Sequence, residues 1–289
     1  MCRLVAYIGK SIPLENIIVK PKHSLLEQSQ VAQEAKLAVN GDGFGIAWYD
    51  GAHDGVYDGA HDGAHDGGEG AQLQRPGLYK DVLPAWSDSN LPSICRMVKS
   101  DLFMAHVRAS TFGTTSRENC HPFAYDNWSF AHNGGIGEFA LIRRKVESLL
   151  DDAFYNARRG CTDSELFFLL MLTNGLADDA ARAVSTTIEQ VTQLAQQYDA
   201  MSSPIRLTCV FSDGRKIYGF RHASDHKSPS LYLSACLDHG GRAIASEPLH
   251  GTGCSQSNAW ETVPEDVLIA LGKGDVKGQE LRTVLAHAA

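Results

Sequence analysis

The chain begins with MCRLVAYIGK, residues 1–10, a stretch rich in the residue types that favour a β-strand. A cysteine stands directly after the initiator methionine. In one interpretation, Cys2 is a small apolar residue that packs at the start of a strand, as most cysteines do. In the other, removal of Met1 leaves Cys2 with a free α-amine, so that a nucleophile and its base share one residue. Position alone favours the first interpretation, and the rest of the sequence has to decide between them.

The order of the expected elements indicates the fold class. Strand patterns come early, at residues 2–9, 43–50, 102–110 and 128–135. Helical patterns follow at 138–150, 162–176 and 177–198, and strands return at 205–223, 230–236, 241–249 and 266–274. Asp213-Gly214 is typical of a hairpin turn inside the first of these later stretches. This order predicts an α+β fold rather than the βαβ alternation of a doubly wound sheet.

Composition and charge exclude several classes of partner and location. The chain has 289 residues, a formal net charge of -8 and no basic cluster, so neither nucleic acid nor an anionic membrane is expected as a partner. No apolar run approaches the ~20 residues that span a bilayer, and the N-terminus lacks the apolar core of a signal peptide. The seven cysteines show no C-x-x-C spacing, which favours a reducing cytoplasm. No Pro/Ser-rich linker divides the chain, so residues 2–289 are expected to form a single domain.

A glycine-rich repeat occupies residues 51–70, GAHDGVYDGAHDGAHDGGEG, in which GAHDG occurs three times. Its His and Asp side chains could bind a metal ion. The alternative is a flexible insertion that projects from a hairpin, because glycine at this density prevents regular structure and the segment has little to bury. We favour the insertion, since hard cations need a fixed ligand geometry that this repeat does not provide.

An arginine in FMAHVRASTFG, residues 103–113, is the first candidate for a binding residue. Within a strand, His106 and Arg108 point to the same face. Arg108 then lies either on a solvent face or in a buried site, where its planar fork could hold a carboxylate through two hydrogen bonds. For this residue alone, the solvent-face interpretation is the simpler one.

The end of the strand in FAHNGGIGEF, residues 130–139, allows two interpretations as well. Asn133 and Gly134 are typical of a turn, because both residue types tolerate a positive φ. They could also form an oxyanion hole from the Asn133 side-chain amide and the Gly134 backbone N–H. Taken by itself, the turn is the simpler interpretation.

A helix start is predicted in CTDSELFF, residues 161–168. Thr162 and Glu165 fit a capping box, which places Asp163 in the first helical turn. Asp163 then either complements the helix dipole or binds the ammonium group of a substrate.

Together these parts resemble the glutaminase site of class II glutamine amidotransferases, a family of N-terminal-nucleophile hydrolases. AHVRASTFG with NCHPF resembles the stretch that holds the arginine for the glutamine carboxylate, HNGG resembles the oxyanion motif, and TDSE resembles the motif of the amino-group aspartate. The resemblance implies a four-layer αββα fold of two antiparallel sheets.

Longer blocks resemble one branch of the family. HSLLEQS, NGDGFGIAWY and ASEPL are similar to the fungal glutathione-degrading amidotransferase-like subunit, and HSLLEQS and DGFG are also similar to the ergothioneine-pathway γ-glutamyl hydrolase. Ala109 and Phe112 stand where glucosamine-6-phosphate synthase has tryptophan and histidine. The implied substrate is therefore glutamine or a γ-glutamyl peptide such as glutathione, not glutamine alone.

The resemblance implies a mechanism that needs neither a metal nor another cofactor. Once Met1 is removed, the α-amine of Cys2 would take the thiol proton, and the thiolate would attack a γ-glutamyl amide. Asn133 and Gly134 would stabilise the oxyanion.

The resemblance also implies how the substrate would be bound. Arg108 would bind the α-carboxylate of the substrate, Asp163 would bind its α-ammonium group, and Thr111 would add a further contact.

Alternatives to this account stay open. The chain could be a non-catalytic, amidotransferase-like partner of a peptidase, or it could bind metal through residues 51–70. If it is an enzyme, a peptidase or an acceptor-enzyme subunit could bind it. His106, His121 and His132 could each act as the base, but we expect them to be structural because the amine already fills that role.

Overall fold

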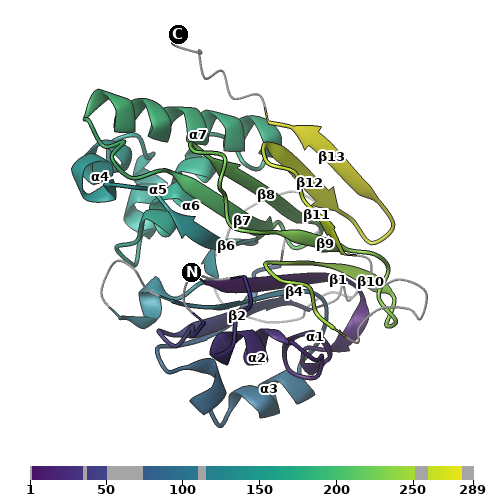
Figure 1. Cartoon of the computed structure of the whole chain (residues 1–289). Coiled ribbons are helices and arrows are strands. Elements are labelled where there is room, and N and C mark those ends of the chain that lie inside the picture. Colours follow the sequence, from purple (N-terminus) through teal and green to yellow (C-terminus); the bar gives the residue numbers. More distant parts are fainter. Residues whose placement is uncertain (1, 35–37, 51–73, 110–114, 251–259, 282–289) are drawn as a thin grey trace, which may run out of the picture.

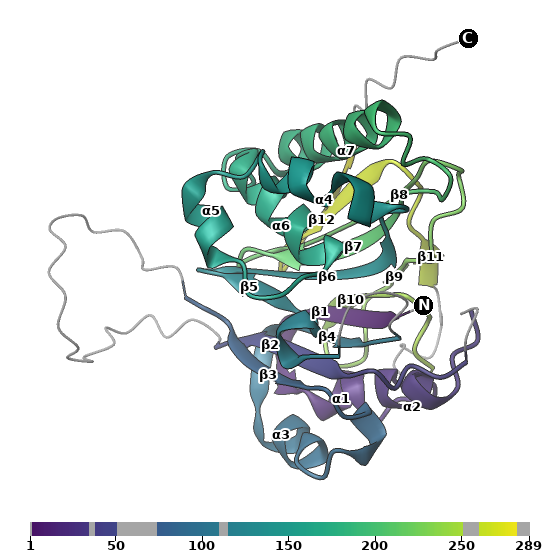
Figure 2. The same ribbon diagram turned by 90° about the vertical axis from the view of Figure 1, so that its left-hand side faces the viewer.

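The computed structural model describes residues 2–34, 38–50, 74–109, 115–250 and 260–281. Within these ranges the chain forms two antiparallel β-sheets that pack face to face, with helices on both outer faces (Figure 1, Figure 2). The predicted α+β class and the four-layer αββα order are both confirmed.

The first sheet has seven strands among the described residues. In order across the sheet they are β11 (Trp260–Thr262), β9 (Tyr232–Ser234), β10 (Gly241–Ala245), β1 (Arg3–Pro13), β4 (Lys99–Val107), β2 (Phe44–Tyr49) and β3 (Gly77–Asp81). The second sheet has six, in the order β13 (Val276–Glu280), β12 (Val267–Leu271), β8 (Ile217–Ala223), β7 (Arg206–Ser212), β6 (Trp128–Gly135) and β5 (Phe123–Tyr125).

Helices cover the two outer faces of this sandwich (Figure 1). Those on the first sheet are α1 (Glu15–Ile18), α2 (Leu25–Gln30) and α3 (Leu91–Met97). Those on the second sheet are α4 (Phe139–Glu147), α5 (Asp152–Ala157), α6 (Asp163–Thr173) and α7 (Ala180–Gln197). Two 3-10 turns, η1 (Ala85–Ser87) and η2 (Arg117–Asn119), lie in connections. Within the described ranges, no helix combines the length and the hydropathy that a membrane span requires.

The alternation of side chains along β1 explains how the layers form. Leu4, Ala6 and Ile8 belong to the core between the two sheets, whereas Val5 and Tyr7 belong to the core under α1–α3. Because both faces of β1 are buried, its sequence is almost continuously apolar instead of alternating with polar residues.

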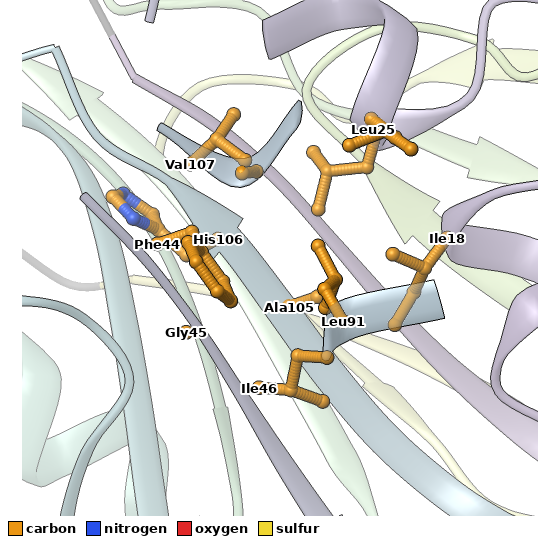
Figure 3. Close-up of a pocket in the computed structure, with 11 residues that line it drawn as sticks. Ile18, Leu25, Phe44, Gly45, Ile46, Leu91, Ala105, His106 and Val107 are labelled. Atoms are coloured by element: carbon orange, nitrogen blue, oxygen red, sulfur yellow. The ribbon is translucent and has the colours of Figure 1, made fainter. Parts of the chain in front are cut away.

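The helices of the first sheet pack tightly onto its outer face. Figure 3 shows Ile18, Leu25 and Leu91, from α1, α2 and α3, gathered with side chains of β2 and β4 around a small pocket. Its lining is apolar apart from His106. The pocket is therefore part of the packed core and offers no group that would bind a charged substrate.

Most expected elements are present, with bounds that differ by a few residues. The helices predicted from 138, 162 and 177 begin at Phe139, Asp163 and Ala180. The hairpin turn between β7 and β8 is confirmed, because the Asp213 carboxylate accepts hydrogen bonds from two backbone N–H groups beyond it, at 2.8 and 2.7 Å. The elements that were not predicted, α1–α3, α5, β5, β11 and β13, have three to seven residues each, too few to show a period.

The repeat at residues 51–70 connects two paired strands. β2 and β3 are antiparallel neighbours, with Phe44 opposite Asp81 and Trp48 opposite Gly77, as a hairpin requires. The repeat itself lies outside the described residues, so its predicted flexibility stays a prediction. The single domain over residues 2–289 stays a prediction as well.

Candidate active site

Cys2 stands immediately before β1. The first residue of β1, Arg3, pairs with Val107, the last residue of β4, so Cys2 lies beside the C-terminal end of β4. Leu4 faces the second sheet, so alternation places the Cys2 side chain on that same face. The backbone N–H of Ala109 donates a hydrogen bond to the Cys2 Sγ at 3.4 Å. Burial raises the pKa of this half-buried thiol, whereas the Ala109 backbone and the charges of Arg108 and Arg3 lower it. A thiol whose pKa is raised stays protonated at neutral pH unless a nearby base takes its proton.

Arg108 follows the last residue of β4, which ends at Val107 and not at residue 110 as predicted. Its side chain is 4% exposed, so the solvent-face interpretation is wrong. Two adjacent residues just before β2 hold the backbone of Arg108 in place. The Arg108 N–H donates to the Gly43 carbonyl oxygen at 2.8 Å, and the Asp42 N–H donates to the Arg108 carbonyl oxygen at 2.9 Å.

Asn133 and Gly134 lie within β6 and pair with Thr208 and Leu207 of β7, so the turn interpretation is also wrong. Asn133 is fully buried, and Ala131 places it on the face between the sheets. Neither Oδ1 nor Nδ2 of Asn133 has a hydrogen-bond partner among the described residues. A buried amide without partners costs about 1–3 kcal/mol, so its presence calls for an explanation.

Gly134 occupies a position that excludes a side chain. Its φ is 149°, and a Cβ atom there would lie 2.0 Å from the Arg206 carbonyl oxygen. At Gly135 the nearest atom to a Cβ would be the Asp163 Oδ2 at 3.7 Å, an ordinary contact.

These two glycines form a matched pair for a stability measurement. Gly134→Ala is expected to lower the free energy of unfolding by about 2–3 kcal/mol, through backbone strain and the clash with Arg206. Gly135→Ala is expected to change it by less than about 0.5 kcal/mol. Urea denaturation of both variants tests this, and equal stabilities would contradict the assignment of Gly134 as the constrained residue.

Asp163 is the first residue of α6, as predicted. The Thr162 side chain caps the helix by accepting a hydrogen bond from the Glu165 N–H at 3.2 Å. The other half of the capping box differs, because the Glu165 carboxylate accepts from the backbone N–H groups of Arg159 and Gly160 instead of from Thr162. The N-terminus of α6 is thus fixed by two side chains and by the loop before it.

The Asp163 carboxylate points to the end of β6. Its Oδ2 accepts a hydrogen bond from the Ile136 N–H at 2.8 Å, and its Oδ1 accepts from the Ser164 N–H at 2.9 Å. Ile136 is the residue directly after β6, so the aspartate lies beside the strand end that carries Asn133 and Gly134.

Buried histidines join β4, from the first sheet, to β6, from the second sheet, next to the candidate site residues. The Nε2 of His106, in β4, lies 3.3 Å from the carbonyl oxygen of His132, in β6, and 2.9 Å from the His121 Nδ1. Burial lowers the pKa of His106 to about 3 and that of His121 well below its usual value, and it lowers the pKa of His132 too. Imidazoles with such low pKa values are weak bases at neutral pH, which supports the prediction that these residues are structural.

The four predicted stretches therefore meet at one end of the sandwich. The Cys2 thiol contacts the residue after Arg108. His106 links β4, the strand that precedes Arg108, to β6, the strand that holds Asn133, and Asp163 lies at the end of β6. Thr111 lies outside the described residues. Among the residues that the structure describes, no group of three or more His, Cys, Asp or Glu side chains could hold a metal ion.

One feature of this region was missed by sequence reasoning. Arg3 is fully buried and forms an ion pair with Glu247. The available signal was a charged residue in the helix-facing register, directly before the apolar run at residues 4–8.

Comparison with known proteins identifies the family. Residues 16–234 match the family model of class II glutamine amidotransferases. Probable glutamine amidotransferase DUG3 of Saccharomyces cerevisiae is 32% identical over 329 residues, covering 99% of this chain and 84% of that protein. The gamma-glutamyl-hercynylcysteine sulfoxide hydrolase of Mycolicibacterium smegmatis is 26% identical over 271 residues, covering 93% of this chain and 95% of that protein.

A solved structure agrees with these relatives. The glutamine aminotransferase class-II domain protein from Silicibacter pomeroyi superposes with a TM-score of 0.71 at 31% sequence identity, covering 97% of this chain and 99% of that chain. The match to the family model and the 32% identity to a relative that is covered over 84% of its length show that the chain belongs to the class II glutamine amidotransferase family.

Proposed function

We propose that the protein is an amidohydrolase that cleaves a γ-glutamyl amide bond, in glutamine or in a γ-glutamyl peptide such as glutathione, through a thioester on Cys2. Family membership and the names of the relatives support this activity. The observation that carries the proposal is the Asn133 amide. It is fully buried, lacks a partner among the described residues, and lies on the face of the second sheet that is turned toward the Cys2 side of the first sheet.

In the proposed reaction, Cys2 supplies both the nucleophile and the base. Removal of Met1 frees the α-amine, whose ordinary pKa of about 8 suits proton transfer at neutral pH. The amine takes the thiol proton, and the thiolate attacks the γ-carbonyl carbon. Negative charge develops on the carbonyl oxygen, where the Asn133 amide and the Gly134 N–H donate hydrogen bonds to it. The ammonium of Cys2 then protonates the departing amine, and water releases glutamate from the thioester.

Charged side chains on both sides of the reacting carbonyl are proposed to hold the glutamyl group. Arg108 binds the α-carboxylate, Asp163 binds the α-ammonium group, and Thr111 adds a contact. Arg108 is buried and clamped through its backbone, and two backbone N–H groups orient Asp163. Groups that are fixed in advance can hold the γ-carbonyl over the sulfur with little further loss of entropy.

Arg108→Lys is expected to raise KM about 10- to 100-fold with a smaller change in kcat. The charge is retained, but a point ammonium cannot reproduce the two parallel hydrogen bonds of a guanidinium. Arg75→Lys is the control, because Arg75 is 80% exposed and pairs with Asp126 at the surface. Steady-state kinetics test the prediction, and an unchanged KM for Arg108→Lys would show that another residue binds the carboxylate.

The wider setting belongs to the proposal as well. The six cysteines among the described residues are all free thiols, which supports a cytoplasmic location. A peptidase or an acceptor-enzyme subunit is the class of partner that would use the products of γ-glutamyl cleavage. Size-exclusion chromatography with candidate subunits tests that association separately from the activity.

Glutamate release by Met1-free protein tests the activity. Glutamine, glutathione and other γ-glutamyl amides are compared in parallel, and γ-glutamyl amides with a blocked α-carboxylate serve as matched controls. Release from at least one free γ-glutamyl substrate, with little from its blocked counterpart, is the expected result. No release from any of them would favour the alternative of a non-catalytic partner subunit.

A further inference from the structure

A buried ionic cluster lies under the first residues of β1, on the face opposite to Cys2. Arg3 is fully buried, and Glu247, in the segment after β10, is 1% exposed. The Arg3 Nη1 donates to the Glu247 Oε1 at 3.0 Å. This pair joins residues that are 244 positions apart in the sequence.

Each oxygen of the Glu247 carboxylate has two hydrogen-bonding partners. Besides Arg3, its Oε1 accepts from the Glu34 N–H at 2.8 Å. Its Oε2 accepts from the Gln33 N–H at 3.1 Å and lies 2.5 Å from the His23 Nε2. One side chain therefore contacts the start of β1, the segment before α2 and the loop after α2.

The segment around Glu247 also holds the backbone of β1. The last residue pair of the β1–β10 ladder is Val5 with Ala245. Beyond it, the Leu4 N–H donates to the Ser246 Oγ at 2.9 Å, and the Ser246 N–H donates to the Leu4 carbonyl oxygen at 3.0 Å. On the other side, Arg3 pairs with Val107 of β4. The residues next to Cys2 are thus held from both sides, although chain termini usually fray.

Stability alone does not explain such a cluster. Buried ion pairs are often no more stabilising than apolar residues of the same volume, because two charges must leave water. Their attested value is that they specify one geometry. Here the geometry that is specified is the path of the two residues that follow the nucleophile.

We propose that Glu247 is a positioning residue, which acts through Arg3 to fix the start of β1 and so the placement of the Cys2 Sγ against Asn133. The kinetic consequence rests on the proposed function. Arg108 is held separately by Gly43 and Asp42, so loss of the cluster should disturb the nucleophile more than the binding of the substrate.

Glu247→Gln is the direct test, because it keeps the size of the side chain and removes the charge and one acceptor oxygen. We expect kcat to fall about 10- to 100-fold, as for a small misplacement of a reacting group, while KM stays within about threefold. Rates are given per folded protein, quantified by circular dichroism of the size-exclusion peak, so that misfolded protein does not count. Glu265→Gln is the matched control, because Glu265 is also a carboxylate with an arginine partner but is half-buried and away from β1. Its Oε1 accepts a hydrogen bond from the Ser228 N–H at 2.8 Å and lies 3.8 Å from the Nη2 of Arg221, in β8.

Two further measurements separate positioning from a general structural role. In a double-mutant cycle, Arg3→Gln and Glu247→Gln should have strongly non-additive effects on kcat, because they break one interaction. The rate at which iodoacetamide alkylates Cys2, read from the Cys2 peptide by mass spectrometry, should change by about fivefold or more in Glu247→Gln. The same rate should stay unchanged in Glu265→Gln.

The outcomes distinguish this inference from the proposed function. If the unmodified protein releases no glutamate, the proposed function fails, and the alkylation rates alone decide on the positioning role. An unchanged alkylation rate, or an unchanged kcat per folded protein in an active enzyme, would overturn the inference. Additive effects of the two substitutions would overturn the part assigned to Arg3.

Discussion

Cys2→Ala is expected to reduce glutamate release by about 10⁴-fold or more, because the substitution removes the atom that forms the thioester. The fold should be retained. The lost sulfur is half-buried, and its contacts are with the backbone of Ala109, so the free energy of unfolding should change by less than about 1 kcal/mol. Activity assays with thermal denaturation of the same sample test both parts.

Cys236→Ala is the matched control for this experiment. Cys236 is an exposed free thiol between β9 and β10 of the first sheet, and it is not one of the candidate site residues. Its activity should equal that of the unmodified protein. The mechanism also requires the free amine, so mass spectrometry should find Met1 absent in active protein. Full turnover by Cys2→Ala, or by protein shown to retain Met1, is incompatible with the account.

Asn133→Ala is expected to lower kcat about 10²- to 10³-fold with little change in KM, as for the loss of one oxyanion donor. Its effect on stability should have the opposite sign to that of most buried substitutions. The Asn133 amide has no partner among the described residues, so its removal should leave the free energy of unfolding unchanged or raise it. A less active but equally or more stable variant is therefore the expected result.

Asn127→Ala provides the contrast for Asn133. Asn127 is also buried, but its Nδ2 donates to the Asp213 carbonyl oxygen at 2.8 Å. Its removal should cost about 1–2 kcal/mol of stability and leave kcat unchanged. If both variants lost stability equally and kept their activity, Asn133 would be a structural residue.

Local rules predicted the parts of the fold that depend on neighbouring residues. The Thr162 cap, the turn at Asp213-Gly214 and the β-strand after Cys2 each follow from a few adjacent positions. Short elements such as α1, with four residues, escaped prediction because they are held by packing on β1 and not by their own periodicity.

Interpretations of single site residues were less successful, for a physical reason. The simpler interpretation of Arg108 was a surface residue, and that of Asn133 was a turn residue. Both residues are buried in the structure. Burial depends on which strands pack together, and a single stretch of sequence does not contain that information. Combining the stretches was what pointed to one site. The pair of Arg3 and Glu247 shows the limit, since no local pattern links two residues so far apart.

Capture of the covalent intermediate tests the central claim most directly. Met1-free protein is mixed with a γ-glutamyl substrate and quenched in acid during turnover, and the peptides are mapped by mass spectrometry. A parallel reaction contains hydroxylamine, which should divert the γ-glutamyl group from glutamate to the hydroxamate. The account predicts a γ-glutamyl group on the Cys2 sulfur and its absence in Cys2→Ala. A γ-glutamyl group on another residue, or glutamate release without any hydroxamate or Cys2 adduct, would contradict it.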